Sequence, residues 1–138
     1  MNVLIDAGPI IALFDDGDDR HDEAIDFFKQ FTGRLVTTCP VITECMWNMK
    51  SDERVQNKLL NDLADGKIYN IEPLIPKDYR RIAELNIKYA DLPADFADLS
   101  LIAISERLSN PKIITFDEDF DVYRRFKRDH FKRVGFSS

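Results

Sequence analysis

The stretch Val3-Leu4-Ile5-Asp6-Ala7-Gly8-Pro9 decides how the rest of this chain is interpreted. A short apolar run ends on an aspartate, and a Gly-Pro pair then breaks the pattern, as expected where a buried strand ends. We therefore expect a strand over Met1–Ile5 and a helical segment over Ile10–Phe14. Asp6 stands where the backbone changes direction, so it is either a helix N-cap or a functional carboxylate.

Four carboxylates stand where a short apolar run begins or ends: Asp6, Glu44, Asp98 and Asp117. If the runs 3–5, 35–38 and 113–115 are parallel strands, three of these acids gather at one end of a sheet. Asp98 would join them from the start of a helix. Carboxylates with no lysine or arginine between them repel one another unless they bind a divalent cation, and hard oxygen ligands favour Mg²⁺ or Mn²⁺.

The remaining apolar runs alternate between strand and helix patterns. Further strands are expected over Arg34–Thr38, Lys67–Glu72, Lys112–Thr115 and, at an edge, Lys132–Phe136. Further helices are expected over Asp22–Phe31, Pro40–Met49, residues 53–64, Pro76–Tyr89, Ala94–Leu108 and Asp119–Lys127, with a break at Leu92-Pro93. This alternation predicts an α/β fold in which helices cover both faces of a parallel sheet of four to five strands.

Composition fits one globular domain over residues 1–138, because 44% of the residues are hydrophobic and 32% are charged. No signal peptide and no membrane-spanning stretch is evident, so we expect a cytoplasmic protein with no membrane association. Cys39 and Cys45 form no metal or redox motif and are expected to be reduced, buried thiols. The net charge of −6 counts against a nucleic-acid binder. The segment Arg124–Arg133 is nevertheless strongly basic, and it is either a phosphate contact or a solvated helix face.

Neighbours of the four acids offer further oxygen atoms and also simpler explanations. Asn48 lies four residues after Glu44 on the same helical face, and Asp95 lies three residues before Asp98. The Asp95 and Asp98 pair could also be a helix-capping arrangement. Asp117 and Asp119 could belong to a solvated acidic turn. The chain has two histidines and no Gly-rich phosphate loop, so water activated by a metal ion is the simplest nucleophile.

Four segments together resemble the motifs of the PIN-domain ribonucleases and, within them, the VapC toxins of prokaryotic toxin–antitoxin pairs. These segments are Val3–Ile10, Pro40–Glu44, Asp95–Ala103 and Ile114–Phe120, and His21–Phe28 also matches a recurrent family segment. The resemblance implies a PIN-like three-layer α/β/α sandwich, a Mg²⁺ or Mn²⁺ site, and hydrolysis of single-stranded or looped RNA. Leu99 departs from the family pattern, in which many members have alanine, but it removes no carboxylate.

The resemblance also implies roles for individual residues. Asp6 and Asp98 would be the most direct metal ligands, Glu44 would complete the metal shell or orient water, and Asp117 would bind through water or hold a second ion. Supporting roles would fall to Asp95, Asp119, Thr115 and Asn48. Hydrolysis would proceed by in-line attack of activated water, leaving a 5′-phosphate and a 3′-hydroxyl. Phosphate contacts would come from Arg20, Lys50, Arg54 or the basic segment.

As a toxin, the protein would take RNA as its substrate, a small antitoxin as its partner, and a homodimer as its assembly. A basic antitoxin side chain would compete with the metal for the four acids. The apolar set Met46, Trp47 and Met49 is expected to be either a docking or dimer surface or ordinary core. Two other functions stay open: RNA processing by a nuclease that is not a toxin, and a PIN-like scaffold that only binds a partner.

An aspartyl-phosphate enzyme is the third alternative, because it also places aspartate at a strand end. A phosphatase of the dehalogenase type needs a second aspartate two residues after the nucleophile, and Gly8 occupies that position. A receiver domain needs a lysine after a late strand, and Ile114-Thr115-Phe116-Asp117 contains none. The sequence therefore disfavours both.

Overall fold

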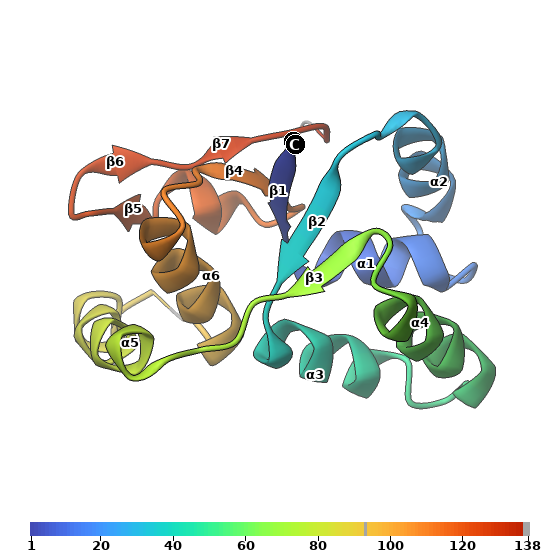
Figure 1. Ribbon diagram of the computed structural model, residues 1–138, viewed down its shortest axis with the longest axis horizontal. Helices are drawn as coiled ribbons and strands as arrows, with labels where there is room; N and C mark the ends of the chain where they lie inside the picture. The colour runs from blue at the N-terminus through green and yellow to red at the C-terminus, as the bar shows by residue number, and fades with distance from the viewer. Residues whose placement is uncertain (93, 137–138) are drawn as a thin grey trace.

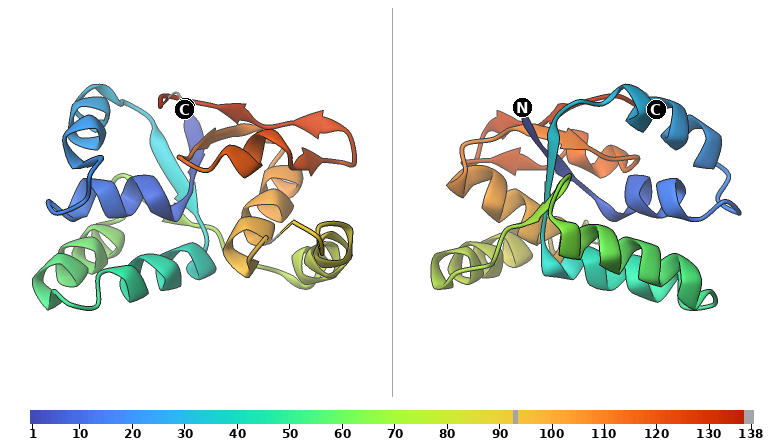
Figure 2. Two further views of the ribbon diagram at one scale, coloured as in Figure 1. Left: turned by 180° about the vertical axis from the view of Figure 1, so that it is seen from behind. Right: turned by 45° about the vertical axis from the view of Figure 1, so that its right-hand side comes forward.

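The computed structural model describes residues 1–92 and 94–136, in which a five-stranded sheet lies between two groups of helices (Figures 1 and 2). The strands are β1 (Asn2–Ile5), β2 (Arg34–Thr37), β3 (Tyr69–Ile71), β4 (Lys112–Ile114) and β7 (Lys132–Arg133). Their order is β3-β2-β1-β4-β7, and each neighbouring pair is parallel. The predicted α/β/α sandwich with a parallel central sheet is confirmed.

The helices follow the strands in the alternation that the sequence predicted. They are α1 (Ala7–Phe14), α2 (His21–Gln30), α3 (Cys39–Asn48), α4 (Glu53–Asp65), α5 (Pro76–Lys88) and α6 (Phe96–Arg107). Helices α1–α4 lie on one side of the strands and α5 and α6 on the other (Figures 1 and 2). The chain runs outward from β1 to β2 and β3, then returns to β4 on the other side of β1. Strand order therefore reverses between β1 and β4, and such switch points are where open α/β sheets form their sites.

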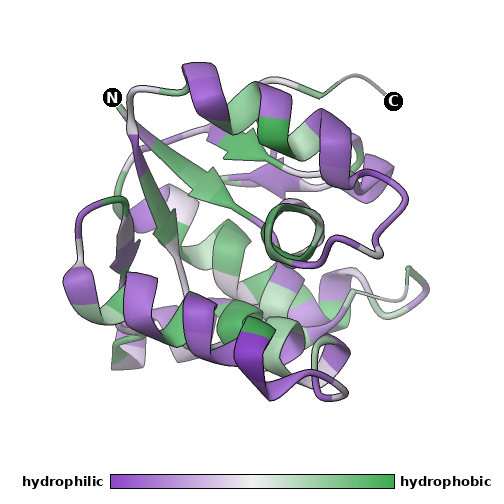
Figure 3. Cartoon of the chain, turned by 90° about the vertical axis from the view of Figure 1, so that its right-hand side faces the viewer, coloured by the Kyte–Doolittle hydropathy of each residue, from purple (hydrophilic) through white to green (hydrophobic). Residues whose placement is uncertain are grey.

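Apolar strands at the centre of the sheet form the core (Figure 3). Val3, Leu4 and Ile5 of β1 are fully buried, as are Ile113 and Ile114 of β4. Helix α6 is buried from residue 97 to residue 105, so it passes through the interior rather than over the surface. These elements have little freedom to move, because protein interiors are close-packed. The side chains at their ends are therefore held on a rigid frame.

Several predicted boundaries differ from the structure. Helix α1 already begins at Ala7, because Asp6 caps it and a proline at the third helical position needs no intrahelical donor. The strand expected over Lys67–Glu72 covers only residues 69–71. The edge strand expected over Lys132–Phe136 is present as β7 over two residues. The break expected at Leu92-Pro93 falls partly on Pro93, which lies outside the described residues.

The helix predicted over Asp119–Lys127 is wrong. A short 3₁₀ turn, η1 (Glu118–Asp121), is followed by a hairpin of β5 (Arg124–Arg125) and β6 (Asp129–His130). Phe126 and Lys127 have φ angles of 48° and 77°, and two consecutive left-handed residues cannot continue a right-handed helix. The basic segment is therefore not a solvated helix face.

Two surface expectations also need correction. Cys45 is buried as predicted, but Cys39 is exposed, and both are free thiols. Of the apolar set on α3, Met49 is buried, Met46 packs against the core and Trp47 is 67% exposed, so the three do not form one surface. Within the described residues, no helix has the length and apolar character needed to cross a bilayer.

Candidate metal centre

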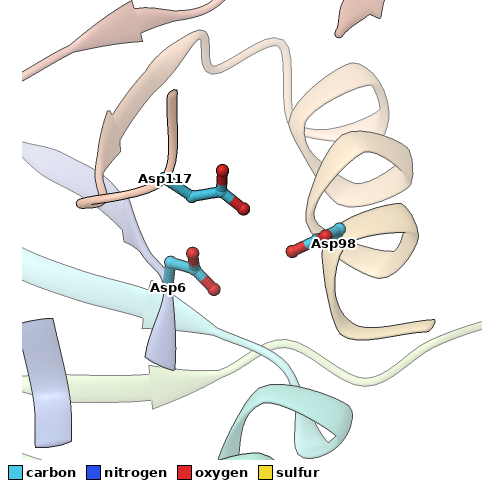
Figure 4. A group of neighbouring side chains, drawn as sticks. All are labelled: Asp6, Asp98 and Asp117. Carbon is cyan, nitrogen blue, oxygen red and sulfur yellow. The ribbon is translucent and has the colours of Figure 1, made fainter. Parts of the chain in front are cut away.

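Three carboxylates from distant parts of the chain meet at the carboxyl ends of β1 and β4. Asp6, Asp98 and Asp117 each present one oxygen atom, and these atoms lie within 4.8 Å of one another (Figure 4). Asp6 directly follows β1, Asp98 lies in the first turn of α6, and Asp117 follows β4 by three residues. The group thus lies at the topological switch point of the sheet.

The Asp6 side chain is fixed from two directions. One oxygen accepts a hydrogen bond from the Ala7 amide at 2.8 Å, so the expected N-cap role is present. The other accepts from the Thr115 hydroxyl at 2.9 Å. Burial raises the pKa of Asp6 to about 6, and the charges of Asp117 and Asp95 add to that rise, although both hydrogen bonds oppose it. Asp6 is therefore both a helix cap and a member of the carboxylate cluster.

Thr115 joins Asp6 to Asp117. Its hydroxyl donates to Asp6 and accepts from the amide of Asp117 at 2.9 Å. Asp117 caps η1 in turn, because one of its oxygens accepts from the amide of Asp119 at 2.8 Å. Asp119 therefore contacts Asp117 through its main-chain amide, and its predicted supporting role stays a prediction.

Asp98 is held by a different set of contacts. Asp95 is the N-cap of α6 and accepts from the amide of Asp98 at 2.8 Å, so the capping explanation holds for Asp95. The carboxylate of Asp98 itself accepts from the hydroxyl of Tyr123 at 3.1 Å. Burial raises the pKa of Asp98 to about 8, with further contributions from the charges of Asp6 and Asp95. Behind this turn, the hydroxyls of Ser100 and Thr38 lie 2.7 Å apart and tie α6 to the end of β2.

Glu44 lies outside the three-carboxylate group but close enough for neighbouring carboxylates to raise its pKa. It is half-buried on α3, and burial raises its pKa to about 7, with smaller contributions from Asp6, Asp95 and Asp117. Asn48 is exposed, and its amide nitrogen donates to the main-chain carbonyl of Glu44. The roles predicted for Glu44 and Asn48 stay predictions.

Glu44 and Asp95 also line an open groove of about 800 Å³ beside the cluster. Its wall is mostly apolar and includes the exposed rings of Trp47, Tyr79 and Phe96. The groove leaves Glu44 and Asp95 open to solvent and to larger molecules.

The chemistry of this donor set fits a hard divalent cation. Among residues 1–92 and 94–136, no ion pair involves Asp6, Glu44, Asp98 or Asp117. The raised pKa values of Asp6, Glu44 and Asp98 share burial as the main cause, and neighbouring carboxylates add to each. Buried carboxylates that lack a basic partner either hold a proton or need another source of positive charge. Oxygen donors alone are what Mg²⁺ and Mn²⁺ prefer.

Sequence reasoning missed Tyr123, the residue that contacts Asp98. It lies 25 positions further along the chain, in a segment interpreted as a helix. An aromatic residue between Val122 and Arg124 looks like an ordinary core position, and no local pattern links it to Asp98. Only the pairing of these two segments in space reveals the contact.

A comparison with known protein families identifies the family of this chain. The sequence profile described as "PIN domain" matches residues 3–125 of this chain. A search of curated protein sequences finds no significant match. The profile match confirms the resemblance that the four sequence motifs indicated.

Several solved structures share this fold. Mycobacterium tuberculosis VapC20, described as a toxin that cleaves the sarcin-ricin loop, is 16% identical with a TM-score of 0.77, and the alignment covers 87% of this chain and 93% of that one. A toxin–antitoxin complex from Klebsiella pneumoniae is 19% identical with a TM-score of 0.63, covering 84% and 87%. VapBC2 from Rickettsia felis, bound to a promoter DNA fragment, is 13% identical with a TM-score of 0.66, covering 96% and 98%. At these identities the likeness is one of fold.

Proposed function

This chain belongs to the PIN domain family, and from that premise we propose that it is an endoribonuclease that depends on Mg²⁺ or Mn²⁺. The observation that carries the proposal is the meeting of Asp6, Asp98 and Asp117 within 4.8 Å at the switch point of the sheet. When bound, the cation would supply positive charge and Lewis acidity to an RNA phosphodiester. Without that charge, the acidic cluster would repel the RNA backbone.

We propose a role for each carboxylate from its surroundings. Asp6 and Asp98 are the most buried of the four and would hold the cation directly. Asp117, fixed by Thr115, would complete the set directly or through a water molecule. Glu44 is more accessible and has a pKa of about 7, so its carboxylate would orient the attacking water and take up its proton. Hydrolysis of this kind leaves a 5′-phosphate and a 3′-hydroxyl.

The biological role we propose is that of a toxin in a type II toxin–antitoxin pair. Support comes from the fold, because the structures that it resembles include a toxin and toxin–antitoxin assemblies. The partner would be a small antitoxin that places a basic side chain among the four acids. The homodimer and the cytoplasmic location stay predictions from sequence.

The direct test is RNA cleavage by purified protein. We expect cleavage with Mg²⁺ or Mn²⁺, none in excess chelator, and loss of activity in Asp6→Asn and Asp98→Asn without unfolding. Asp26→Asn is the matched control, because Asp26 is an exposed aspartate on α2 outside the cluster. Activity that persists in chelator, or products with 2′,3′-cyclic phosphate ends, would contradict the mechanism.

A separate test addresses the toxin role. Expression of the wild-type protein should slow bacterial growth, Asp98→Asn should not, and coexpression of a cognate antitoxin should restore growth. Harmless expression of soluble, nuclease-active protein would favour an RNA-processing role instead. Absence of both toxicity and cleavage would favour the scaffold alternative.

A further inference from the structure

We propose that Tyr123 is a positioning residue for the metal centre, acting through the carboxylate of Asp98. This inference rests on the proposed function, because it assigns a residue to the same site. The Tyr123 hydroxyl donates to Oδ2 of Asp98 at 3.1 Å. Tyr123 is fully buried, so it cannot touch an RNA substrate and would act only through Asp98.

The position of Tyr123 is fixed by its neighbours. Its ring contacts the rings of Phe120 and Tyr89 edge-on, at centroid distances of 5.0 and 5.1 Å. The next residue, Arg124, donates its amide to the hydroxyl of Tyr89 at 2.8 Å. Tyr89, which follows α5, therefore contacts Tyr123 through its ring and the next residue's backbone through its hydroxyl. The hydroxyl of Tyr123 is thus presented to Asp98 at a defined place.

One short segment contains Asp117, a member of the cluster, and Tyr123, the residue that holds Asp98. Asp117 caps η1 and belongs to the carboxylate group, while Tyr123 follows the same turn by two residues and holds Asp98. The amide of Tyr123 donates to the carbonyl of Asp119 at 2.9 Å, which closes the turn. The separation of Asp98 from Asp117 therefore depends on the shape of one segment, residues 117–123.

The hydroxyl has a chemical role that a phenyl ring could not fill. It occupies one oxygen of Asp98, and among the described residues no hydrogen bond reaches the other oxygen. That leaves Oδ1 available to a ligand, on a carboxylate that Tyr123 holds in place. Outer partners of this kind orient metal-binding side chains, and their loss weakens metal affinity. Phenylalanine would fill the same space in the core. The hydroxyl is therefore the group that distinguishes a positioning role from a packing role.

The test compares Tyr123→Phe with Tyr69→Phe in the full chain, using Mn²⁺ alone as the probe. Tyr69 is similarly buried, in β3, and no described hydrogen bond joins its hydroxyl to a carboxylate. We expect Tyr123→Phe to bind Mn²⁺ about tenfold more weakly, measured by the electron paramagnetic resonance signal of free Mn²⁺. Tyr69→Phe should bind as wild type does. Replacement of Tyr123 by 4-aminophenylalanine, which keeps a donor at the same place, should restore affinity.

RNA cleavage provides a second readout. At limiting Mn²⁺, Tyr123→Phe should lower kcat and leave KM for RNA unchanged, and excess Mn²⁺ should recover the rate. If Tyr123→Phe binds Mn²⁺ as tightly as wild type, the positioning role is wrong. It is also wrong if the phenylalanine and aminophenylalanine variants lose the same affinity. Neither result bears on the proposed nuclease. A wild-type protein that binds Mn²⁺ but cuts no RNA would refute the proposed nuclease and leave this inference standing. Failure of the wild type to bind Mn²⁺ would overturn both.

Discussion

At the scale of single residues, Asp98 links the chemistry of the site to pH. Its pKa is raised to about 8, first by burial and then by the charges of Asp6 and Asp95. In the metal-free protein this carboxyl is therefore largely protonated at neutral pH. Because a cation binds the charged form, it must displace that proton.

We predict that Mn²⁺ affinity rises between pH 6 and pH 9 and that binding releases protons. The rise should level off above the pKa of Asp98, where the carboxylate is already charged. Titration calorimetry in buffers with different ionisation enthalpies measures both quantities. Affinity that is constant over this range would show that Asp98 does not bind the cation.

The same pKa shifts affect the stability of the metal-free fold. Between the ordinary pKa of 3.8 and the raised value of about 8, the folded chain holds the Asp98 proton and the unfolded chain has lost it. Stability from this group therefore falls as pH rises through that window. We predict that Asp98→Asn flattens the pH dependence and melts at or above wild type at pH 8 without metal. Melting curves at several pH values, with Asp26→Asn as control, measure the difference.

At the scale of secondary-structure elements, Arg107 connects the end of α6 to the start of α5. Its guanidinium donates to Asp78 at 3.1 Å, to Glu72 at 2.7 Å and to the carbonyl of Pro73 at 2.9 Å. Asp78 is buried and also accepts from the amide of Ile75, so it caps α5. The pair thus holds the two helices that lie on the Asp98 side of the sheet.

We predict that Arg107→Ala lowers the free energy of unfolding by about 2–4 kcal/mol, because it leaves Asp78 buried without its charged partner. Urea denaturation of the metal-free protein measures this loss. Arg80→Ala removes an exposed arginine from α5, the helix that Asp78 caps, and should change stability by less than about 0.5 kcal/mol. Equal effects of the two variants would mean that the network contributes little.

At the scale of the whole molecule, the net charge is −6, and the basic residues near the C-terminus differ in their exposure. Arg125 is buried and donates to the hydroxyl and carbonyl of Ser105, and Arg124 donates to main-chain carbonyls of residues 121–123. These two arginines hold the C-terminal hairpin in place. Of the basic segment, Lys127, Arg128 and Lys132 are exposed, so they are better placed for phosphate contacts.

Metal binding should stabilise the whole fold. A cation that binds only the folded state adds about 1.4 kcal/mol at tenfold excess over its Kd. For a domain of this size, that corresponds to about 2–6 °C in Tm. We predict that Mn²⁺ raises the Tm of wild type and of Asp26→Asn by this amount and that of Asp98→Asn by little. Equal shifts in all three proteins would exclude Asp98 as a ligand.

The sequence by itself determined the parallel sheet and led to the expectation that acids meet at the ends of its strands. Runs such as Val3-Leu4-Ile5 are strongly apolar and end on an acid, and a parallel alternation brings strand ends together whatever the details of packing. The fold class follows from that local pattern, and the family follows from the resemblance of the four sequence motifs. The pattern predicted Asp6, Glu44 and Asp117 at strand ends with Asp98 beside them, whereas the structure brings Asp6, Asp98 and Asp117 together.

Tertiary structure decided what local pattern cannot encode. Residues 119–127 have the composition of a helix, but Tyr123 is held by Asp98 and Arg125 by Ser105, and these contacts across about 20 residues or more require a turn and a hairpin. The Tyr123 contact also holds the Asp98 carboxylate, and Glu44, on α3, lies outside the group of three acids. Hydrophobic periodicity indicates which face of an element is buried. Which side chains contact each other depends on which elements meet in space.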